Sequence, residues 1–238
     1  MRLFRETCAA WYANKTPLKL CNLTNEYCQK LELTEQNLQT AFSQLKGVQG
    51  KAQLYFDSIK GRGFTNPLIA SADREFQRST YVCYTHGDLN SDNILVNESK
   101  EAWLIDFEYT GPGHILRDIA ELDLVVRAEL LKAEEASLNE RLELEEALIR
   151  ATSFQDLESL RDNFDTENPA LAKAYNTVLH LRTIAAEKVA TNPNANLDEY
   201  YIALMYYSLN ALRFLSWRGV ARQHCLLSAC LIADNLGL

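Results

Sequence analysis

The feature that most constrains the fold is a predicted β-hairpin in the middle of a chain whose remaining pattern is helical. Two short runs of β-favouring residues, 94–96 (ILV) and 103–105 (WLI), are separated by a turn-forming stretch at 97–100 (NESK). A further β-favouring run at 81–84 (YVCY) precedes them. A hairpin brings the residue before its first strand and the residue after its second strand to the same end. We therefore expect the flanking side chains to meet there.

The rest of the chain is predicted to be helical. Glycine and proline are scarce, with 9 and 5 residues in 238, and such a composition favours long helices over turn-rich β architecture. Apolar residues keep a helical period over 38–59, and the glycines of 61–63 (GRG) end that stretch. The fold class is therefore α+β and mostly helical. The hairpin region is the only predicted β structure, which leaves no room for a sheet of several strands before residue 60.

From residue 116 onward the sequence predicts a series of helices. Ser137 begins a capping box, and Asn168 followed by proline is a typical helix start. We expect one helix from Asn196 to Gly219, and a solvated helix face for the glutamate-rich run at 134–146. Neither an internal repeat nor a linker is visible. We predict one domain over residues 1–238, composed of a helical entry segment (1–80), a catalytic and metal core (81–123) and a helical subdomain (124–238).

Charge and cysteine content limit the function classes. The chain has 24 Lys and Arg against 32 Asp and Glu, a formal net charge of −8. This acidic balance argues against a nucleic-acid partner, which normally requires a clustered basic excess. Six cysteines occur without a C-x-x-C pair, and we expect reduced thiols. No signal peptide or membrane span is visible, so we predict a cytoplasmic protein without membrane contact.

The residues that carry chemistry lie beside the hairpin. Asp88 follows the run at 81–84, Asn93 immediately precedes the first hairpin strand, and Asp106 immediately follows the second. Phosphoryl transfer from ATP needs a carboxylate to orient or deprotonate the attacking hydroxyl and hard oxygen ligands for Mg²⁺. The hairpin spacing places the amide oxygen of Asn93 and the carboxylate of Asp106 at the same end of one small sheet, and Asp88 lies in the loop after the preceding strand. The Tyr and Trp residues of 200–217 offer a possible aromatic cage for a cation, although core packing is the better interpretation of their helical setting.

His86-Gly87-Asp88 with Asn93, followed by Asp106 in 105–108 (IDFE), resembles the aminoglycoside phosphotransferase and choline kinase-like family, which has a protein-kinase-like fold. The resemblance covers about residues 81–123. It implies that Asp88 is the catalytic base, that Asn93 and Asp106 are cofactor-binding residues that hold Mg²⁺, and that His86, also in the cofactor-binding set, braces the loop.

The resemblance extends to two more acidic residues. Asp118 matches a position that supports the catalytic loop through hydrogen bonds. Glu108 is either a solvent-facing turn residue or a contact to the substrate or a second metal. Asn90 departs from the histidine often found there in the antibiotic kinases.

The N-terminal lobe of such enzymes has no counterpart in the sequence. Upstream of Asp88 we find neither a G-x-G-x-x-G loop nor a strand lysine. The chain is therefore predicted to be the C-terminal lobe of an ATP- and Mg²⁺-dependent phosphotransferase whose acceptor is a hydroxyl of a small molecule. Its partners would be ATP, the acceptor and the missing lobe, and the isolated chain should be inactive. Two alternatives remain: a non-catalytic kinase-like module that binds a partner or nucleotide, and a helical protein in which the motif is coincidental.

Overall fold

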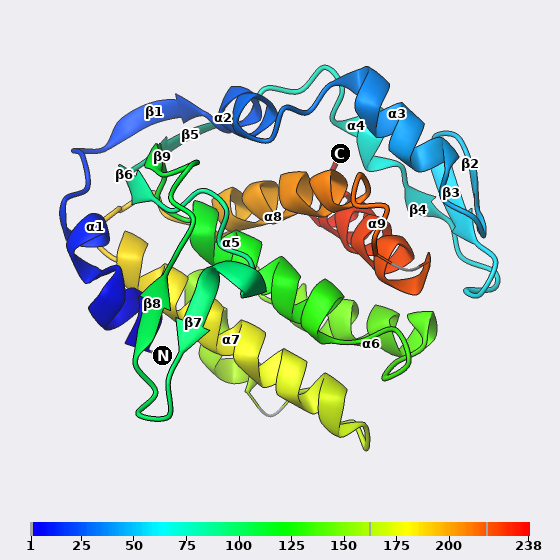
Figure 1. The fold of residues 1–238 in the computed structure, drawn as a ribbon. Coiled ribbons are helices and arrows are strands. Elements are labelled where there is room, and N and C mark those ends of the chain that lie inside the picture. Colours follow the sequence, from blue (N-terminus) through cyan, green and yellow to red (C-terminus); the bar gives the residue numbers. More distant parts are fainter. Residues whose placement is uncertain (1, 162, 218) are drawn as a thin grey trace.

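The computed structural model describes residues 2–161, 163–217 and 219–238, and about 51% of it is helical, with small antiparallel sheets. The α+β class predicted from the sequence is therefore confirmed. The longest helices form the body of the molecule (Figure 1). The helical elements are η1 (Leu3–Thr7), α1 (Ala9–Ala13), α2 (Leu23–Lys30), α3 (Glu35–Ser43), α4 (Pro67–Ala70), η2 (Ser91–Asn93), α5 (Arg117–Leu124), η3 (Val125–Leu130), α6 (Leu138–Leu148), η4 (Phe154–Leu160), α7 (Pro169–Val189), α8 (Leu197–Ala211) and α9 (Gly219–Asn235).

All strand pairs described are antiparallel, and they form four small sheets. Their order is β1–β5, β2–β3–β4, β6–β9 and β7–β8. The strands are β1 (Lys19–Asn22), β2 (Val48–Gly50), β3 (Gln53–Phe56), β4 (Phe64–Thr65), β5 (Gln77–Thr80), β6 (Val82–Thr85), β7 (Ile94–Val96), β8 (Ala102–Leu104) and β9 (Gly111–His114). The predicted hairpin is β7–β8, in which Leu95 lies opposite Trp103.

The prediction of a helical entry segment over 1–80 is wrong in part, because the five strands β1 to β5 lie within it. The helix expected over 38–59 stops after α3, and the chain forms β2 and β3 instead. Gly50 has a φ of 120°, and a Cβ there would lie 2.0 Å from the carbonyl oxygen of Gln53, so the turn requires glycine. Leu54 and Phe56 are buried while their neighbours are exposed, which is the period-two pattern of a strand.

This three-stranded sheet does not take the place of a second lobe over the hairpin. In Figure 1 the sheet β2–β3–β4 lies beside α9, whereas the hairpin β7–β8 lies on the opposite side of the helical body, next to η1.

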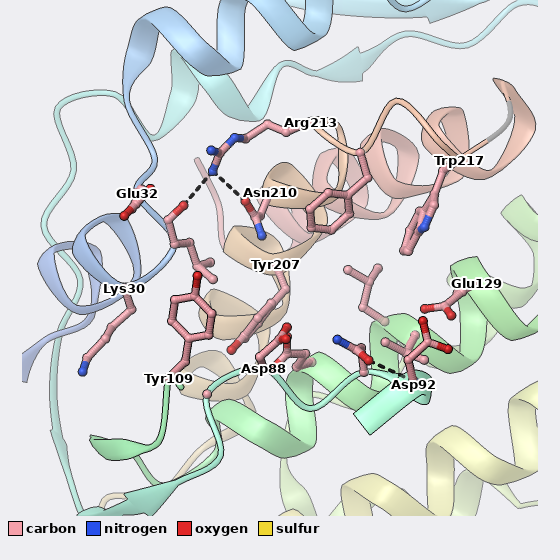
Figure 2. Close-up of a pocket in the computed structure, with 17 residues that line it drawn as sticks. Lys30, Glu32, Asp88, Asp92, Tyr109, Glu129, Tyr207, Asn210, Arg213 and Trp217 are labelled. Carbon is pink, nitrogen blue, oxygen red and sulfur yellow. Dashed lines mark hydrogen bonds between the residues drawn. The ribbon is translucent and has the colours of Figure 1, made fainter. Parts of the chain in front are cut away.

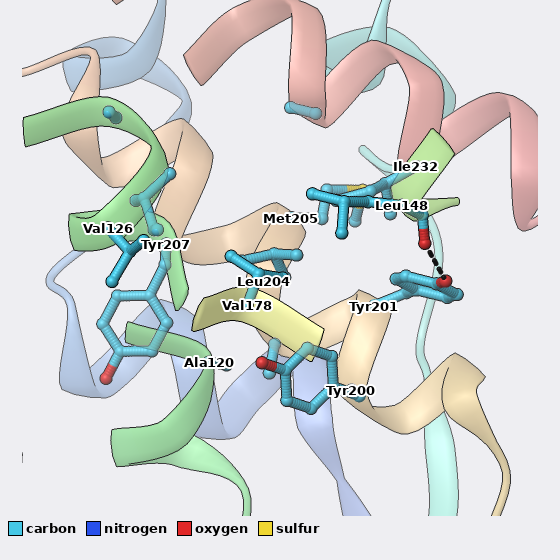
Figure 3. Packing of buried hydrophobic residues seen from close by; sticks show 14 of the residues in the cluster. Ala120, Val126, Leu148, Val178, Tyr200, Tyr201, Leu204, Met205, Tyr207 and Ile232 are labelled. Atoms are coloured by element: carbon cyan, nitrogen blue, oxygen red, sulfur yellow. Dashed lines mark hydrogen bonds between the residues drawn. The ribbon is translucent and has the colours of Figure 1, made fainter. Parts of the chain in front are cut away.

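The helical core is continuous and contains the aromatic residues of α8. Tyr200, Tyr201, Tyr206 and Tyr207 are between 0% and 4% exposed and pack with aliphatic side chains from α5, α7 and α9 (Figure 3). Core packing is thus their main role, as predicted.

The expected helix from Asn196 to Gly219 is shorter: α8 ends at Ala211 and a new helix begins at Gly219. No described helix combines the length and apolar character that crossing a membrane demands.

The glutamate-rich run was predicted to be a solvated helix face, but Glu145 on α6 is buried. It pairs with Arg127 and lies 2.7 Å from Nε2 of His224. Burial opposes ionisation, but these two partners outweigh it and lower the pKa of Glu145 to about 2. Arg127 also donates to Asp123 at 2.6 Å, so a buried charge network joins α5, α6 and α9. All six cysteines are free thiols, and four of them are buried.

Candidate active site

The loop between β6 and η2 carries Asp88, and the side chain of Asn93 fixes it. Nδ2 of Asn93 donates to the carbonyl oxygen of Asp88 at 2.8 Å and to its Oδ2 at 3.0 Å. Asn90 caps η2 by accepting from the backbone N–H groups of Asp92 and Asn93 at 3.0 and 3.2 Å. The two residues that the motif pairs therefore lie side by side, with their geometry set by a short 3₁₀ turn.

Side chains of helix α5 hold the same loop by hydrogen bonds to its backbone. Asp118 accepts from the backbone N–H of His86 at 2.8 Å and from that of Gly87 at 3.0 Å. Arg117 donates to the carbonyl oxygen of Gly87 at 2.7 Å. Burial raises the pKa of Asp118, although the two backbone donors oppose that rise. Asp118 therefore lies where the resemblance places a residue that supports the loop.

His86 links the loop to the end of the hairpin. Its side chain is fully buried, and Nε2 lies 2.9 Å from the carbonyl oxygen of Ile105. Because a carbonyl only accepts, Nε2 carries the proton. The backbone N–H of Ile105 in turn donates to the carbonyl oxygen of Asn93 at 3.2 Å. The residues before and after the hairpin thus meet at one end, which is what the spacing predicts.

Asp106 follows β8 in a left-handed conformation with a φ of 61°. Its side chain is exposed, and so is that of Glu108. Neither carboxylate has a hydrogen bond or ion pair within the described ranges. Asp106 is placed beside the loop by the backbone of Ile105, whereas among the described residues no hydrogen bond joins Glu108 to Asp88 or Asn93.

A cavity of about 580 Å³ opens beside Asp88, between α2, α5, α8 and the loop (Figure 2). Asn93, Asp106 and Glu108 do not line it. Its walls combine carboxylates with aromatic rings. The carboxylates are Glu32, Asp88, Asp92, Glu121 and Glu129, the rings are Tyr109, Tyr207, Phe214 and Trp217, and the cations among its described lining are Lys30 and Arg213.

Glu121 is the wall residue that sequence reasoning missed. Its Oε2 accepts from the backbone N–H of Leu89 at 2.9 Å. Burial, then the carboxylates of Asp118 and Asp88, raise the pKa of Glu121 to about 8. The available signal was its spacing: Glu121 lies three residues after Asp118, hence one helical turn away on the same face of α5.

The metal ligands expected from the motif form a small donor set. The described residues contain no group of three or more His, Cys, Asp or Glu side chains placed to hold a metal ion. Asn93 uses its Nδ2 for Asp88 and leaves Oδ1 without a partner in the described chain. Mg²⁺ keeps water and phosphate oxygens for most of its positions, so one amide oxygen and one carboxylate are compatible with it.

Residues 55–213 match the family model named ternary complex associated domain 9. The chain belongs to this family. The matched segment includes the loop of Asp88, the hairpin, α5 and most of the cavity wall. Neither a curated protein nor a solved structure matches the chain.

Proposed function

We propose that this member of the ternary complex associated domain 9 family is the C-terminal lobe of a phosphotransferase of the aminoglycoside phosphotransferase and choline kinase type. The proposed reaction moves the γ-phosphoryl group of ATP to a hydroxyl of a small molecule. The observation that carries the proposal is the contact of Asn93 with both the backbone and the carboxylate of Asp88, at an end of the hairpin that also presents Asp106. A scaffold needs none of these contacts.

Asp88 is the residue that receives the acceptor hydroxyl, because it lines the cavity in which a small molecule fits. Its carboxylate orients the hydroxyl and accepts its proton as the oxygen bonds to the γ-phosphorus. The bond between that phosphorus and the bridging oxygen breaks, and ADP leaves. Asn93 maintains the direction of the carboxylate through its 3.0 Å hydrogen bond.

Oδ1 of Asn93 and the carboxylate of Asp106 would hold Mg²⁺, with which ATP is normally bound. The ion would supply positive charge that neutralises the phosphate oxygens. Both residues lie outside the cavity that Asp88 lines, which leaves separate positions for the nucleotide and the acceptor.

An apolar surface beside these ligands supports a nucleotide site. On the outer face of β7–β8, Leu95, Trp103 and Ile105 are 49%, 48% and 42% exposed. Soluble proteins rarely expose such side chains together without a partner. We assign this hairpin face, defined by the three residues, to the base of ATP and to the second lobe that would cover it.

The charge of the cavity favours a cationic acceptor. Its described lining has five carboxylates against two cations, together with four aromatic rings. Even with Glu121 protonated, a net negative field and aromatic rings attract an amine or ammonium group. The proposed acceptor is therefore a hydroxyl compound that carries an amine.

A second candidate function is a non-catalytic module that binds a partner. The observation that favours it is the same hairpin face, whose three apolar side chains are 42% to 49% exposed. The family description also refers to a ternary complex. In that case Asp88 would be dispensable for the biological role.

The deciding experiment measures phosphate transfer from Mg·[γ-³²P]ATP to amino alcohols, aminoglycosides and sugars. The chain is assayed alone and in the complex recovered with it from its native cells. We expect transfer by the complex, abolished by Asp88→Asn and by Asp106→Asn but retained by Glu108→Gln. Transfer that survives Asp88→Asn would contradict the assignment of the base. Tight ATP binding with turnover by the 238 residues alone would contradict the need for a second lobe.

A further inference from the structure

Two carboxylates on successive turns of α5 grip the loop that carries Asp88. Asp118 binds the backbone N–H groups before Asp88, and Oε2 of Glu121 binds the N–H of Leu89, directly after it. The peptides on both sides of Asp88 are therefore fixed to one helix. Asp118 is fully buried and has no access to the cavity, whereas Glu121 is partly exposed and lines it.

Only one of the two carboxyl oxygens of Glu121 is used in a hydrogen bond within the described chain. Oε2 is used for Leu89, and Oε1 has no hydrogen-bond partner within the part of the chain that the structure describes. Oε1 is also not among the polar side-chain atoms that are fully buried without a partner. Because Glu121 belongs to the cavity wall, this oxygen is the one available to a bound molecule.

The groups around Glu121 determine whether Oε1 carries a proton and therefore whether it donates or accepts a hydrogen bond. Asp118 and Arg117 face it from its own helix, Asp88 from the loop and Tyr207 from α8. Burial and the two aspartates raise the pKa of Glu121 to about 8, so the carboxyl mostly keeps its proton at neutral pH. Oε2 already accepts an N–H, and the proton therefore resides on Oε1. A neutral acid of this kind donates a hydrogen bond.

We propose that Glu121 is a specificity residue: one oxygen fixes the backbone beside Asp88, and the other donates a hydrogen bond to an uncharged oxygen of the phosphoryl acceptor. This inference rests on the proposed function and narrows its substrate class. The acceptor carries an ether, carbonyl or second hydroxyl oxygen near the reacting hydroxyl. Its amine would lie toward Asp92 and Glu129, which Figure 2 shows close together and away from Arg213.

The first test requires no turnover. The ¹⁵N and ¹H shifts of the Leu89 amide are followed by NMR from pH 5.5 to 9.5 without Mg²⁺. We expect the wild-type shift to titrate near pH 8, the titration to vanish in Glu121→Gln, and its midpoint to fall in Asp88→Asn, because one neighbouring negative charge is removed. A flat wild-type curve, or the same curve in Glu121→Gln, would overturn the inference. Glu121→Gln has the same shape as the wild-type side chain, so the test remains possible if Glu121→Ala does not fold.

The second test uses two probes that differ in one atom. 2-(2-Aminoethoxy)ethanol and 5-aminopentan-1-ol have the same length, the same amine and the same hydroxyl, but only the first has an ether oxygen. Dissociation constants are measured from shifts of the Trp217 indole. We expect the ether compound to have a dissociation constant about fivefold lower, which is the difference that one ordinary hydrogen bond makes. Glu121→Gln keeps a hydrogen-bond donor and should retain this preference for the ether compound. Glu121→Ala should abolish the preference.

The matched control is Glu129→Gln, which lies in the same cavity. It should weaken both probes equally and leave their ratio unchanged. Equal affinity of the wild type for the two probes, or no binding of either at millimolar concentration, would overturn the inference. If the ratio responds to Glu121 as expected but no acceptor receives phosphate, the proposed function fails and the hydrogen-bond role of Glu121 stands.

Discussion

The backbone N–H of His86 donates to the carboxylate of Asp118 across 2.8 Å, although 32 residues separate them in the chain. The same carboxylate accepts from Gly87 at 3.0 Å and from the hydroxyl of Tyr12 at 3.3 Å. One buried side chain thus joins the N-terminal helical segment, the candidate catalytic loop and α5. The position of Asp88 depends on this junction, because two of its bonds involve the residues directly before Asp88.

The first prediction concerns this junction. Asp118→Ala should lower the free energy of unfolding by about 3 kcal/mol, because it leaves two buried backbone N–H groups without acceptors. Asp118→Asn keeps one accepting oxygen and should cost less. The measurement is urea denaturation at pH 7. Glu187→Ala is the control, since the exposed pair of Glu187 with Arg5 should be worth less than about 1 kcal/mol. Equal losses in the two alanine variants would show that Asp118 does not hold the loop.

The second prediction concerns Gly87, whose φ is 85°. A Cβ at this position would lie 2.4 Å from the carbonyl oxygen of Tyr109 and 3.1 Å from the guanidinium of Arg117. Gly87→Ala should therefore both strain the backbone and displace the loop, at a total cost of about 3 kcal/mol. Gly61 is the matched control: its φ is 75°, but nothing lies within 4 Å of a Cβ there. Gly61→Ala should cost about 1 kcal/mol. Thermal unfolding of the two variants distinguishes steric contact from backbone strain alone.

Local sequence pattern was sufficient for the hairpin and for the neighbourhood of Asp88. The turn-forming residues of 97–100 and the β-favouring strands around them act over short distances, and β7–β8 forms where expected. The spacing of Asn93 and Ile105 then determines which ends meet. The capping box at Ser137 and the cap at Asn168 are likewise local and are present in the structure.

What the sequence could not supply are features that depend on long-range packing. The strand β3 alternates only over four residues, too short to be distinguished from a helix by periodicity. In the sequence Glu145 cannot be distinguished from the other glutamates of its run, because its partners Arg127 and His224 come from other helices. Glu121 belongs to the same group, because the cavity that makes its second oxygen available is formed by α2, α5 and α8 together.

The third prediction is a loss of stability in acid with two components. Burial, more than the opposing contact with Glu145, lowers the pKa of His224 below 6.5. The unfolded chain therefore takes up a proton that the folded chain does not, and the contribution of His224 to stability falls as pH drops below about 6.5. Glu121, whose pKa is raised to about 8, changes the stability in the opposite direction over the same range, so the effect of His224 is measured as a difference between wild type and variant. Glu145, whose pKa is about 2 in the fold against 4.5 unfolded, stabilises above pH 4.5, and that part is lost between pH 4.5 and 2.

The measurement is the free energy of unfolding by urea between pH 7 and 2. From pH 6.5 to 5 the His224→Gln variant should lose less stability than the wild type, and Glu145 should account for a loss of about 3 kcal/mol between pH 4.5 and 2. A curve for His224→Gln that is parallel to that of the wild type above pH 5 would exclude the histidine as the source.

The last prediction concerns the hairpin face. Leu95 and Trp103 lie directly opposite each other and are about half exposed. Replacing both with serine should lower the free energy of unfolding by about 2–3 kcal/mol, because the buried half of each side chain and their contact across the strands are lost. If this face receives the base of ATP and the second lobe, the same variant should raise the KM for ATP in the complex at least about tenfold, as loss of two large apolar contacts implies. Leu20→Ser, on β1 and 71% exposed, is the control and should leave KM unchanged. Both variants are assayed at a temperature at which urea denaturation shows them to be folded, so a change in KM confined to the hairpin face separates a binding surface from apolar side chains that are merely exposed.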